Sequence, residues 1–253
     1  MVDANLLARE LDEALLGRRE IPPLTKTHGD FDLEMAYSIQ RAGLSLRCAR
    51  GERVVGYKMG LTSEAKRAQM SLASPIHGYL TDAMRVHEAV RVGTGVHPKI
   101  EPEIAFVTGR ELKGTVTRDE ALRACAGVAP ALEILDSRFV GFKYFSLPDV
   151  VADDCSSFCF ALGDLVAPCE VGDLLMRMSI DGRVVQEARS SAISGHPVDS
   201  LVQLCAMLAL HGKSLPAGSI VLAGAATVAE PLGAGMRVLL EVESLGAVGV
   251  FAE

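Results

Sequence analysis

Two glutamates one residue apart stand in the stretch HPKIEPEIAFV, residues 97–107, where their spacing permits metal-binding chemistry. On a β-strand the side chains of residues i and i+2 share a face, so Glu101 and Glu103 should point together while Pro102 points away. Adjacent carboxylates repel unless a cation or proton lies between them. Their hard oxygen atoms favour Mg²⁺ or Mn²⁺ over Zn²⁺. By itself the pattern is also typical of a solvated strand face.

A third carboxylate interrupts an apolar, β-prone run, ALEILDSRF at residues 131–139. Burying Glu133 in such a run would be costly without a partner. One alternative is a salt bridge from Glu133 to Arg138 or to a nearby lysine. Asp136 and Arg138 are expected to pair with each other as scaffold, which leaves Glu133 as the better candidate for a third metal ligand.

A lysine ends a short β-prone run in VVGYKMGLTSEAKRAQM, residues 54–70. Lys58 has apolar neighbours and precedes a turn, a position from which side chains commonly enter a site; the alternative is a solvated surface lysine. The helix expected next, capped by Thr62 or Ser63, would offer free N–H groups and the positive end of its dipole to an anion. Lys66 lies one turn into that helix.

The N-terminal part of the chain is predicted to be helical. Residues 2–17 form a charged amphipathic pattern, and residues 33–50 carry apolar side chains at roughly helical spacing, with Asp32 placed to cap their start. The Pro-containing link Ile21–Leu24 favours a boundary between a helical region, residues 1–50, and a main domain, residues 51–253.

The sequence of the main domain predicts many short strands and few helices. Helices are expected at 118–126, capped by Thr117, and at 198–211, opened by Pro197. The expected strands are 54–57, 100–107, 131–135, 174–180, 220–222, 238–242 and 248–251. This order argues against a doubly wound βαβ sheet and favours an α+β fold with a mixed, strongly curved sheet. Nucleotide-binding and serine-hydrolase motifs are missing.

Composition limits the partners. The net charge of −7 argues against nucleic-acid binding, because phosphate contacts need a basic face. No stretch is apolar enough for a membrane span, and the N-terminus is unlike a signal peptide, so we expect a cytoplasmic protein. The six cysteines are expected to be reduced thiols. Cys155, Cys159 and Cys169 have no fourth ligand nearby in sequence to complete a zinc site.

These motifs together resemble the family of 2-oxopent-4-enoate hydratases and 4-oxalocrotonate decarboxylases, within the fumarylacetoacetase superfamily. The resemblance covers FDLEMAYSIQ, GYKMGLTS, HPKIEPEIAFV, PALEILDSR and VVADDCSS, the GHP at 195–197 and the C-terminal strands. It implies a mixed β-roll of the fumarylacetoacetase C-terminal-domain type and a Mg²⁺ or Mn²⁺ ion. By motif, the metal ligands fall on Glu101, Glu103 and Glu133, and an active-site lysine falls on Lys58.

Local features favour the decarboxylase branch. KMGLTSEAKRAQM and the following SPIHGYL resemble decarboxylases, with Ile76 where the hydratase pattern has an aspartate. GYLTDAM, residues 78–84, resembles the hydratases instead. The chain departs from the family in having His77 where an aromatic residue is usual, Asp154 in place of asparagine, and RSSAISGHP in place of a Gly/Ala-rich run.

The resemblance implies metal-dependent decarboxylation of 2-oxo-3-hexenedioate to 2-hydroxypenta-2,4-dienoate in meta-cleavage aromatic catabolism. Lys58 would assist as a hydrogen-bond donor or acid, with Lys66 beside it. The expected substrate-binding residues are Thr62, Ser63, Ile76 and Ser156. Alternatives are 2-oxopent-4-enoate hydratase, acylpyruvate hydrolysis and a metal-stabilised structural protein. A homo-oligomer, or a complex with a paired hydratase, is expected from the resemblance alone.

Overall fold

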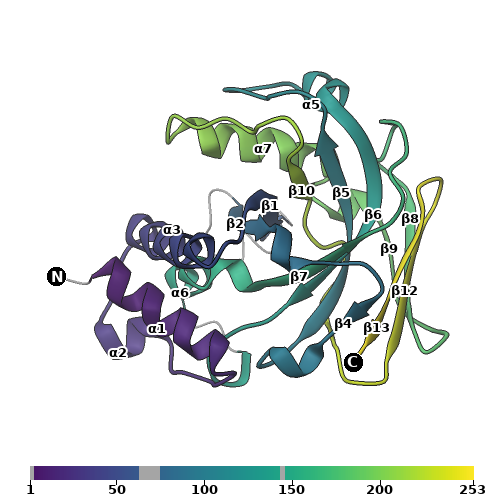
Figure 1. Ribbon diagram of the computed structural model, residues 1–253. Helices are drawn as coiled ribbons and strands as arrows, with labels where there is room; N and C mark the ends of the chain where they lie inside the picture. Colours follow the sequence, from purple (N-terminus) through teal and green to yellow (C-terminus); the bar gives the residue numbers. More distant parts are fainter. Residues whose placement is uncertain (1–2, 63–74, 143–145) are drawn as a thin grey trace.

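In the computed structural model two curled β-sheets surround a shared core, and helices gather beside one of them (Figure 1). The structure describes residues 3–62, 75–142 and 146–253. The helices there are α1 (Ala4–Leu16), α2 (Leu24–His28), α3 (Leu33–Ala49), α5 (Arg118–Ala124), α6 (Leu147–Ala152) and α7 (Pro197–Ala209).

The first sheet runs in the order β2-β1-β10-β5-β6-β7-β3, with β11 also paired to β5. Its strands are β1 (Val54–Gly60), β2 (Ile76–Thr81), β3 (Arg85–Val86), β5 (Lys99–Thr108), β6 (Cys125–Leu135), β7 (Ser157–Leu162), β10 (Ile220–Leu222) and β11 (Glu230–Pro231). The parallel pairing of β1 with β10 and of β3 with β7 makes this sheet mixed.

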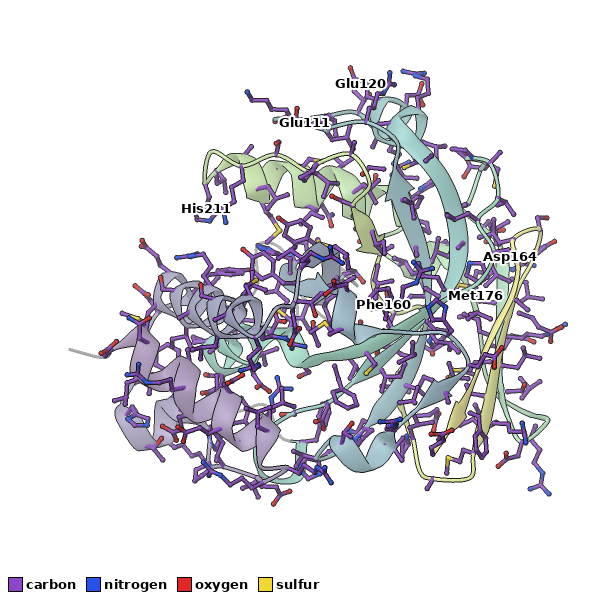
Figure 2. All side chains as sticks on the ribbon, in the orientation of Figure 1. Glu111, Glu120, Phe160, Asp164, Met176 and His211 are labelled. Atoms are coloured by element: carbon purple, nitrogen blue, oxygen red, sulfur yellow. The ribbon has the colours of Figure 1, made fainter. Side chains whose placement is uncertain are left out.

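The second sheet runs in the order β4-β13-β12-β8-β9. Its strands are β4 (Ala89–Val90), β8 (Leu175–Ile180), β9 (Arg183–Arg189), β12 (Arg237–Val242) and β13 (Gly246–Ala252). Side chains from both sheets and from α7 form one hydrophobic cluster, in which Phe106, Met178, Leu204 and Leu240 are fully buried. Figure 2 shows the buried Met176 in the interior and Asp164 at the outer edge.

The N-terminal helices form a second cluster with the segment around α6. Leu7 on α1 and Ile39 on α3 pack in one buried group with Phe139, Val150 and Ile76. Ile76 belongs to β2, so this helical layer reaches the edge of the first sheet. Figure 1 shows α1, α2 and α3 side by side next to α6.

The predicted α+β class with mixed, curved sheets is confirmed. The helix caps at Asp32 and Thr117 are also present, each accepting a hydrogen bond from the first turn. The predicted strands all occur, several of them longer than expected. The strands β2, β7 and β9 and the two-residue strands β3, β4 and β11 were missed. The division at residue 50 stays a prediction. No helix among the described residues is long and apolar enough to cross a membrane.

Candidate active site

The long hairpin of β5 and β6 brings the three glutamates together. In the antiparallel register Glu101 stands directly opposite Glu133, and Glu103 follows two residues later on the same face of β5. One carboxylate oxygen from each lies within 4.8 Å of the others. Glu103 and Glu133 are almost completely buried, with 0% and 1% exposure, while Glu101 is partly exposed. We call these residues the carboxylate cluster.

Several oxygen atoms of the carboxylate cluster lack a hydrogen bond. Glu103 Oε2 accepts a hydrogen bond from the Gly224 N–H at 2.7 Å. Within the described part of the chain, Glu103 Oε1 and both carboxylate oxygens of Glu133 have no hydrogen-bond partner, although Glu133 Oε1 forms an ion pair with Lys58. Burial, followed by the charges of Glu133 and Glu101, raises the pKa of Glu103 well above its ordinary value. Buried, mutually repelling oxygens of this kind fit a divalent cation such as Mg²⁺ or Mn²⁺.

Lys58 places a positive charge beside the carboxylate cluster. Its Nζ forms an ion pair with Glu133 Oε1 at 3.0 Å, although β10 and β5 separate β1 from β6 in the sheet. The curl of the sheet brings the two side chains together. Burial acts to lower the pKa of Lys58, but the charges of Glu133 and Glu101 outweigh it and raise the pKa above its ordinary value. Lys58 is therefore a buried ammonium group.

Gly224 is a supporting residue that the sequence patterns did not predict. Its φ of +105° is in the region that favours glycine, and a Cβ there would lie 2.5 Å from the Thr62 side chain. Thr62 is itself buried. Because Gly224 has no side chain, the backbone of the loop after β10 can contact Thr62 while the Gly224 N–H donates a hydrogen bond to Glu103. A lone glycine in the sequence gives no signal of such a contact.

A cavity of about 370 Å³ opens beside the carboxylate cluster. Of the predicted site residues, Lys58, Thr62, Ile76 and Glu101 line it. Ser156 is fully buried and is not among the lining residues. Ser63 and Lys66 lie outside the described residues.

Lys99, Phe142 and Cys155 are among the lining residues that were not singled out as site residues from the sequence. Lys99 Nζ lies 4.3 Å from the centre of the Phe142 ring, at the wall of the cavity. Cys155 also lines the cavity, and burial raises the pKa of its thiol above the ordinary value. Lys99 and Glu101 lie two residues apart on one strand, so strand parity alone places them on the same face.

Cys155 reaches the cavity from a strained turn. Asp154, Cys155 and Ser156 have φ values of 49°, 52° and 62°, in the left-handed region. Hydrogen bonds on both sides hold the turn: Asp154 Oδ1 accepts from the Tyr79 N–H at 2.8 Å, and the Ser156 carbonyl accepts from the Asp136 N–H at 2.9 Å.

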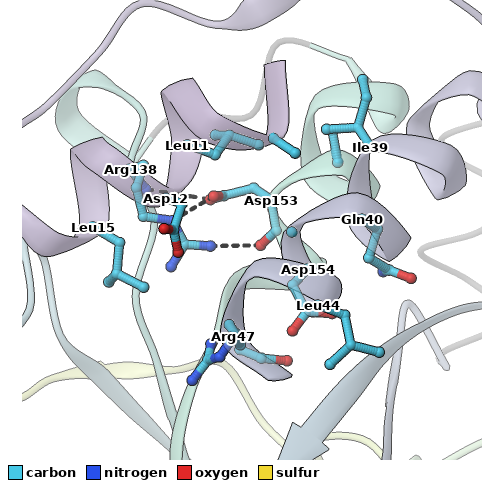
Figure 3. Close-up of a pocket in the computed structure, with 14 residues that line it drawn as sticks. Leu11, Asp12, Leu15, Ile39, Gln40, Leu44, Arg47, Arg138, Asp153 and Asp154 are labelled. Atoms are coloured by element: carbon cyan, nitrogen blue, oxygen red, sulfur yellow. Dashed lines mark hydrogen bonds and ion pairs between the residues drawn. The ribbon is translucent and has the colours of Figure 1, made fainter. Parts of the chain in front are cut away.

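The expected pairing of Asp136 with Arg138 is wrong. Arg138 donates to the Asp153 side chain and, at 2.6 Å, to its carbonyl oxygen (Figure 3). Asp136 instead accepts from the backbone N–H groups of Val96 and His97 at 2.9 and 2.5 Å. Arg138 is buried, and the carboxylate that reaches it lies on a segment fifteen residues further along the chain. Local spacing does not reveal that partner.

The chain is similar over nearly its whole length to proteins of known activity. Residues 53–250 match the family described as fumarylacetoacetate (FAA) hydrolase C-terminal. A 4-oxalocrotonate decarboxylase of Pseudomonas sp. is 46% identical over 96% of this chain and 95% of its own length. A 2-hydroxyhexa-2,4-dienoate hydratase of Comamonas testosteroni is 34% identical over 96% of this chain and 94% of its own.

Solved structures include a similar protein with ligands bound. The 4-oxalocrotonate decarboxylase from Pseudomonas putida G7, complexed with magnesium and adipate, superposes with a TM-score of 0.94 at 33% identity. The match covers 99% of this chain and 97% of that one.

Proposed function

The chain belongs to the fumarylacetoacetate hydrolase C-terminal family, and we propose that it is a metal-dependent lyase that decarboxylates 2-oxo-3-hexenedioate. The products are 2-hydroxypenta-2,4-dienoate and CO₂, in the meta-cleavage breakdown of aromatic compounds. The observation that carries the proposal is the cavity lined by Lys58, Glu101 and an apolar wall that includes Ile76, next to the buried Glu103 and Glu133. A hydratase would need an acid or base at that wall.

Glu101, Glu103 and Glu133 would hold the cation, which we propose to be Mg²⁺ or Mn²⁺. When bound, such an ion supplies Lewis-acid stabilisation of negative charge on the keto oxygen of a 2-oxo acid. Magnesium in the similar decarboxylase structure supports this choice. So does the set of buried carboxylate oxygens without hydrogen bonds.

Lys58 would act on the charge that develops during decarboxylation. When the C5–C6 bond breaks, its electron pair spreads through the C3–C4 double bond toward the C2 oxygen, and the C6 carboxylate leaves as CO₂. The buried Lys58 ammonium can donate a hydrogen bond to the dienolate that forms, and then a proton. Preorganised donors of this kind typically contribute about 3–4 kcal/mol to lowering a barrier.

The rest of the cavity would select and desolvate the distal carboxylate. Ile76 and Val150 give the wall an apolar surface, which favours neutral CO₂ over a carboxylate. Lys99 provides a cation beside Phe142 with which an entering dicarboxylate can pair. Thr62, Ser63 and Lys66 remain the substrate contacts proposed from the motifs, whereas Ser156, which is fully buried and does not line the cavity, is not retained as one.

The test is to incubate purified protein with Mg²⁺ and 2-oxo-3-hexenedioate, and separately with 2-hydroxypenta-2,4-dienoate. We expect CO₂ release from the first and no hydration of the second. Hydration without CO₂ release would favour the hydratase alternative, which the residues 78–84 and the 34% identical hydratase support. Turnover of neither, with metal binding unchanged in Glu101→Gln, would overturn the proposal.

We also propose that the protein is cytoplasmic and acts as a homo-oligomer or in complex with a paired hydratase. Light scattering coupled to size-exclusion chromatography measures the molar mass of the protein and so tests for a homo-oligomer. Co-purification with a co-expressed 2-oxopent-4-enoate hydratase would test the second.

A further inference from the structure

A second cavity, of about 80 Å³, lies between α3 and the end of α7. Its walls are Leu208 and a set of aromatic and basic side chains, namely Tyr37, Arg41, His77, Tyr79, His211 and Lys213. Figure 2 labels His211 where α7 ends, across from α3.

The second cavity and the proposed catalytic cavity lie on opposite faces of the strand β2. Side chains alternate along a strand, so on β2 Ile76 faces one side while His77 and Tyr79 face the other. Ile76 lines the cavity beside the carboxylate cluster, and His77 and Tyr79 line the second cavity. A ligand in the second cavity would be separated from Lys58 by the thickness of the sheet.

The second cavity is electropositive. Its basic side chains are Arg41, His211 and Lys213, and no carboxylate lines it. Within residues 3–62, 75–142 and 146–253, none of these three forms an ion pair. Arg41 donates to the Ser38 hydroxyl and Lys213 to the Tyr79 hydroxyl, at 2.8 and 3.4 Å. Cations gathered around a concave surface create a potential that attracts anions.

A buried imidazole in the second cavity has an unused polar atom. His77 is 5% exposed, and its Nδ1 has no hydrogen-bond partner among the described residues. Burial and the charges of His211, Lys213 and Arg41 lower the pKa of His77 to about 4, which places those charges around this ring. Leaving such a nitrogen buried and unpaired is unfavourable, so a ligand that hydrogen-bonds to it would gain affinity.

The remaining walls suit the non-polar part of a small molecule. The Tyr37 ring stacks on His77 with 4.9 Å between ring centres, and Tyr79 closes another side. Aromatic faces favour flat, apolar groups, whereas the cations and His77 favour a negatively charged oxygen. The volume limits the ligand to a few heavy atoms.

We propose that the second cavity binds a small planar carboxylate. Arg41 and Lys213 pair with its oxygens, the imidazole of His77 hydrogen-bonds to it, and the tyrosine rings contact its carbon chain. This site is independent of the proposed decarboxylation and needs no metal.

Crotonate, a planar four-carbon carboxylate, is a suitable probe. The ring nitrogens of His77 can be followed by NMR in ¹⁵N-labelled, Mg²⁺-loaded protein, and His77→Gln identifies their signals. At constant ionic strength we expect a saturable shift of those signals. Arg41→Gln and Lys213→Gln should each raise the crotonate concentration for half-saturation by about 10-fold, since each removes a charge-assisted contact.

Two controls distinguish binding in the second cavity from binding in the catalytic cavity and from general attraction of anions. Lys99→Gln, which changes a cation of the catalytic cavity, should leave the titration of His77 unaltered. Inorganic phosphate should produce a weaker response, because its tetrahedral shape leaves the tyrosine rings without a contact. The proposal is overturned if His77 does not respond, if phosphate matches crotonate, or if the response survives both Arg41→Gln and Lys213→Gln. Loss of the response in Lys58→Met alone would overturn it as well, because crotonate would then act from the catalytic cavity.

Discussion

At the scale of single residues, Glu133 makes the sharpest test of metal binding. It is buried, faces Glu101 across the hairpin, and pairs with Lys58. We expect Glu133→Ala to weaken Mn²⁺ binding by at least about 100-fold, because changes even behind a metal ligand cost 10- to 100-fold. Isothermal titration with Mn²⁺ measures this. Glu88→Ala, which removes an exposed glutamate, is the matched control, and equal affinity in the two variants would contradict the assignment.

Substitution of Lys58 should lower the rate of catalysis without weakening metal binding. Lys58→Met keeps the length of the side chain and removes the ammonium group that faces Glu133. We expect kcat for CO₂ release to fall by about 10²–10⁴-fold, the usual range for loss of a general acid. Mn²⁺ affinity should stay the same or rise, since a competing cation is gone. A kcat close to that of the unchanged protein would remove Lys58 from the mechanism.

Asp154 is expected to make stability depend on pH. Burial raises the pKa of Asp154 to about 7, from an ordinary value of 3.8. Because the folded-state pKa is raised, its contribution to stability is complete below pH 3.8 and is lost as the pH rises through about 7. Asp154→Asn keeps an oxygen for the Tyr79 N–H and cannot ionise. Urea unfolding should therefore show the variant more stable by up to about 4 kcal/mol at pH 8. At pH 4 the two proteins should be nearly equal, and a difference that does not change with pH would contradict this.

Residue spacing in the sequence predicted the members of the carboxylate cluster, but it did not predict the residues that surround them. The parity of Glu101 and Glu103 follows from the geometry of a strand, and Glu133 was conspicuous because it interrupts an apolar run. Cys155 and Gly224 gave no comparable signal. Their roles depend on a left-handed turn and on a contact between segments far apart in the chain.

At the scale of elements, the loop after β10 fixes the geometry around Glu103. Gly224→Ala would place a methyl group 2.5 Å from Thr62 atoms, at a φ of +105°. We expect the variant to lose more than about 1 kcal/mol of unfolding free energy and to bind Mn²⁺ more weakly, because the N–H that holds Glu103 must move. Urea unfolding and Mn²⁺ titration measure the two effects.

Gly235→Ala is the matched control for the strain of a positive φ. Gly235 has a φ of +91°, but nothing lies within 4 Å of an added Cβ. This variant should lose stability and keep its Mn²⁺ affinity. If both variants bind Mn²⁺ as the unchanged protein does, the β10 loop does not support the metal site.

Elements with a regular pattern were predictable, and those defined by tertiary contacts were not. The helices α3 and α7 carry apolar periodicity and recognisable starts, Asp32 and Pro197. The strand β2 is buried along its whole length and contains a glycine and a histidine, so it shows no alternation. The strand β9 is mostly exposed at the edge of its sheet, and most of its residues are polar or charged, so it shows no apolar alternation.

At the scale of the whole molecule, the buried carboxylates should link metal binding to stability. A ligand that binds only the folded state stabilises it. We expect Mn²⁺ to raise the Tm and EDTA to lower it. Glu103→Gln should raise the Tm in EDTA, since it replaces a carboxyl group whose charged form is disfavoured by burial and by the charges of Glu133 and Glu101. The same variant should lose most of the rise caused by Mn²⁺. Scanning calorimetry with and without Mn²⁺ measures both, and a lower Tm in EDTA would contradict the repulsion argument.

The hydrogen bond from Gly224 to Glu103 joins residues 121 positions apart, and β10 lies between β1 and β5 in the first sheet. During synthesis, β1, β5 and β6 leave the ribosome long before β10 does. Until then β1 lacks the strand that pairs it with the rest of the sheet, so the position of Lys58 relative to Glu133 is not fixed. The carboxylate cluster is therefore completed only when most of the chain has been translated, and a nascent chain that stops before β10 cannot hold the metal in this geometry.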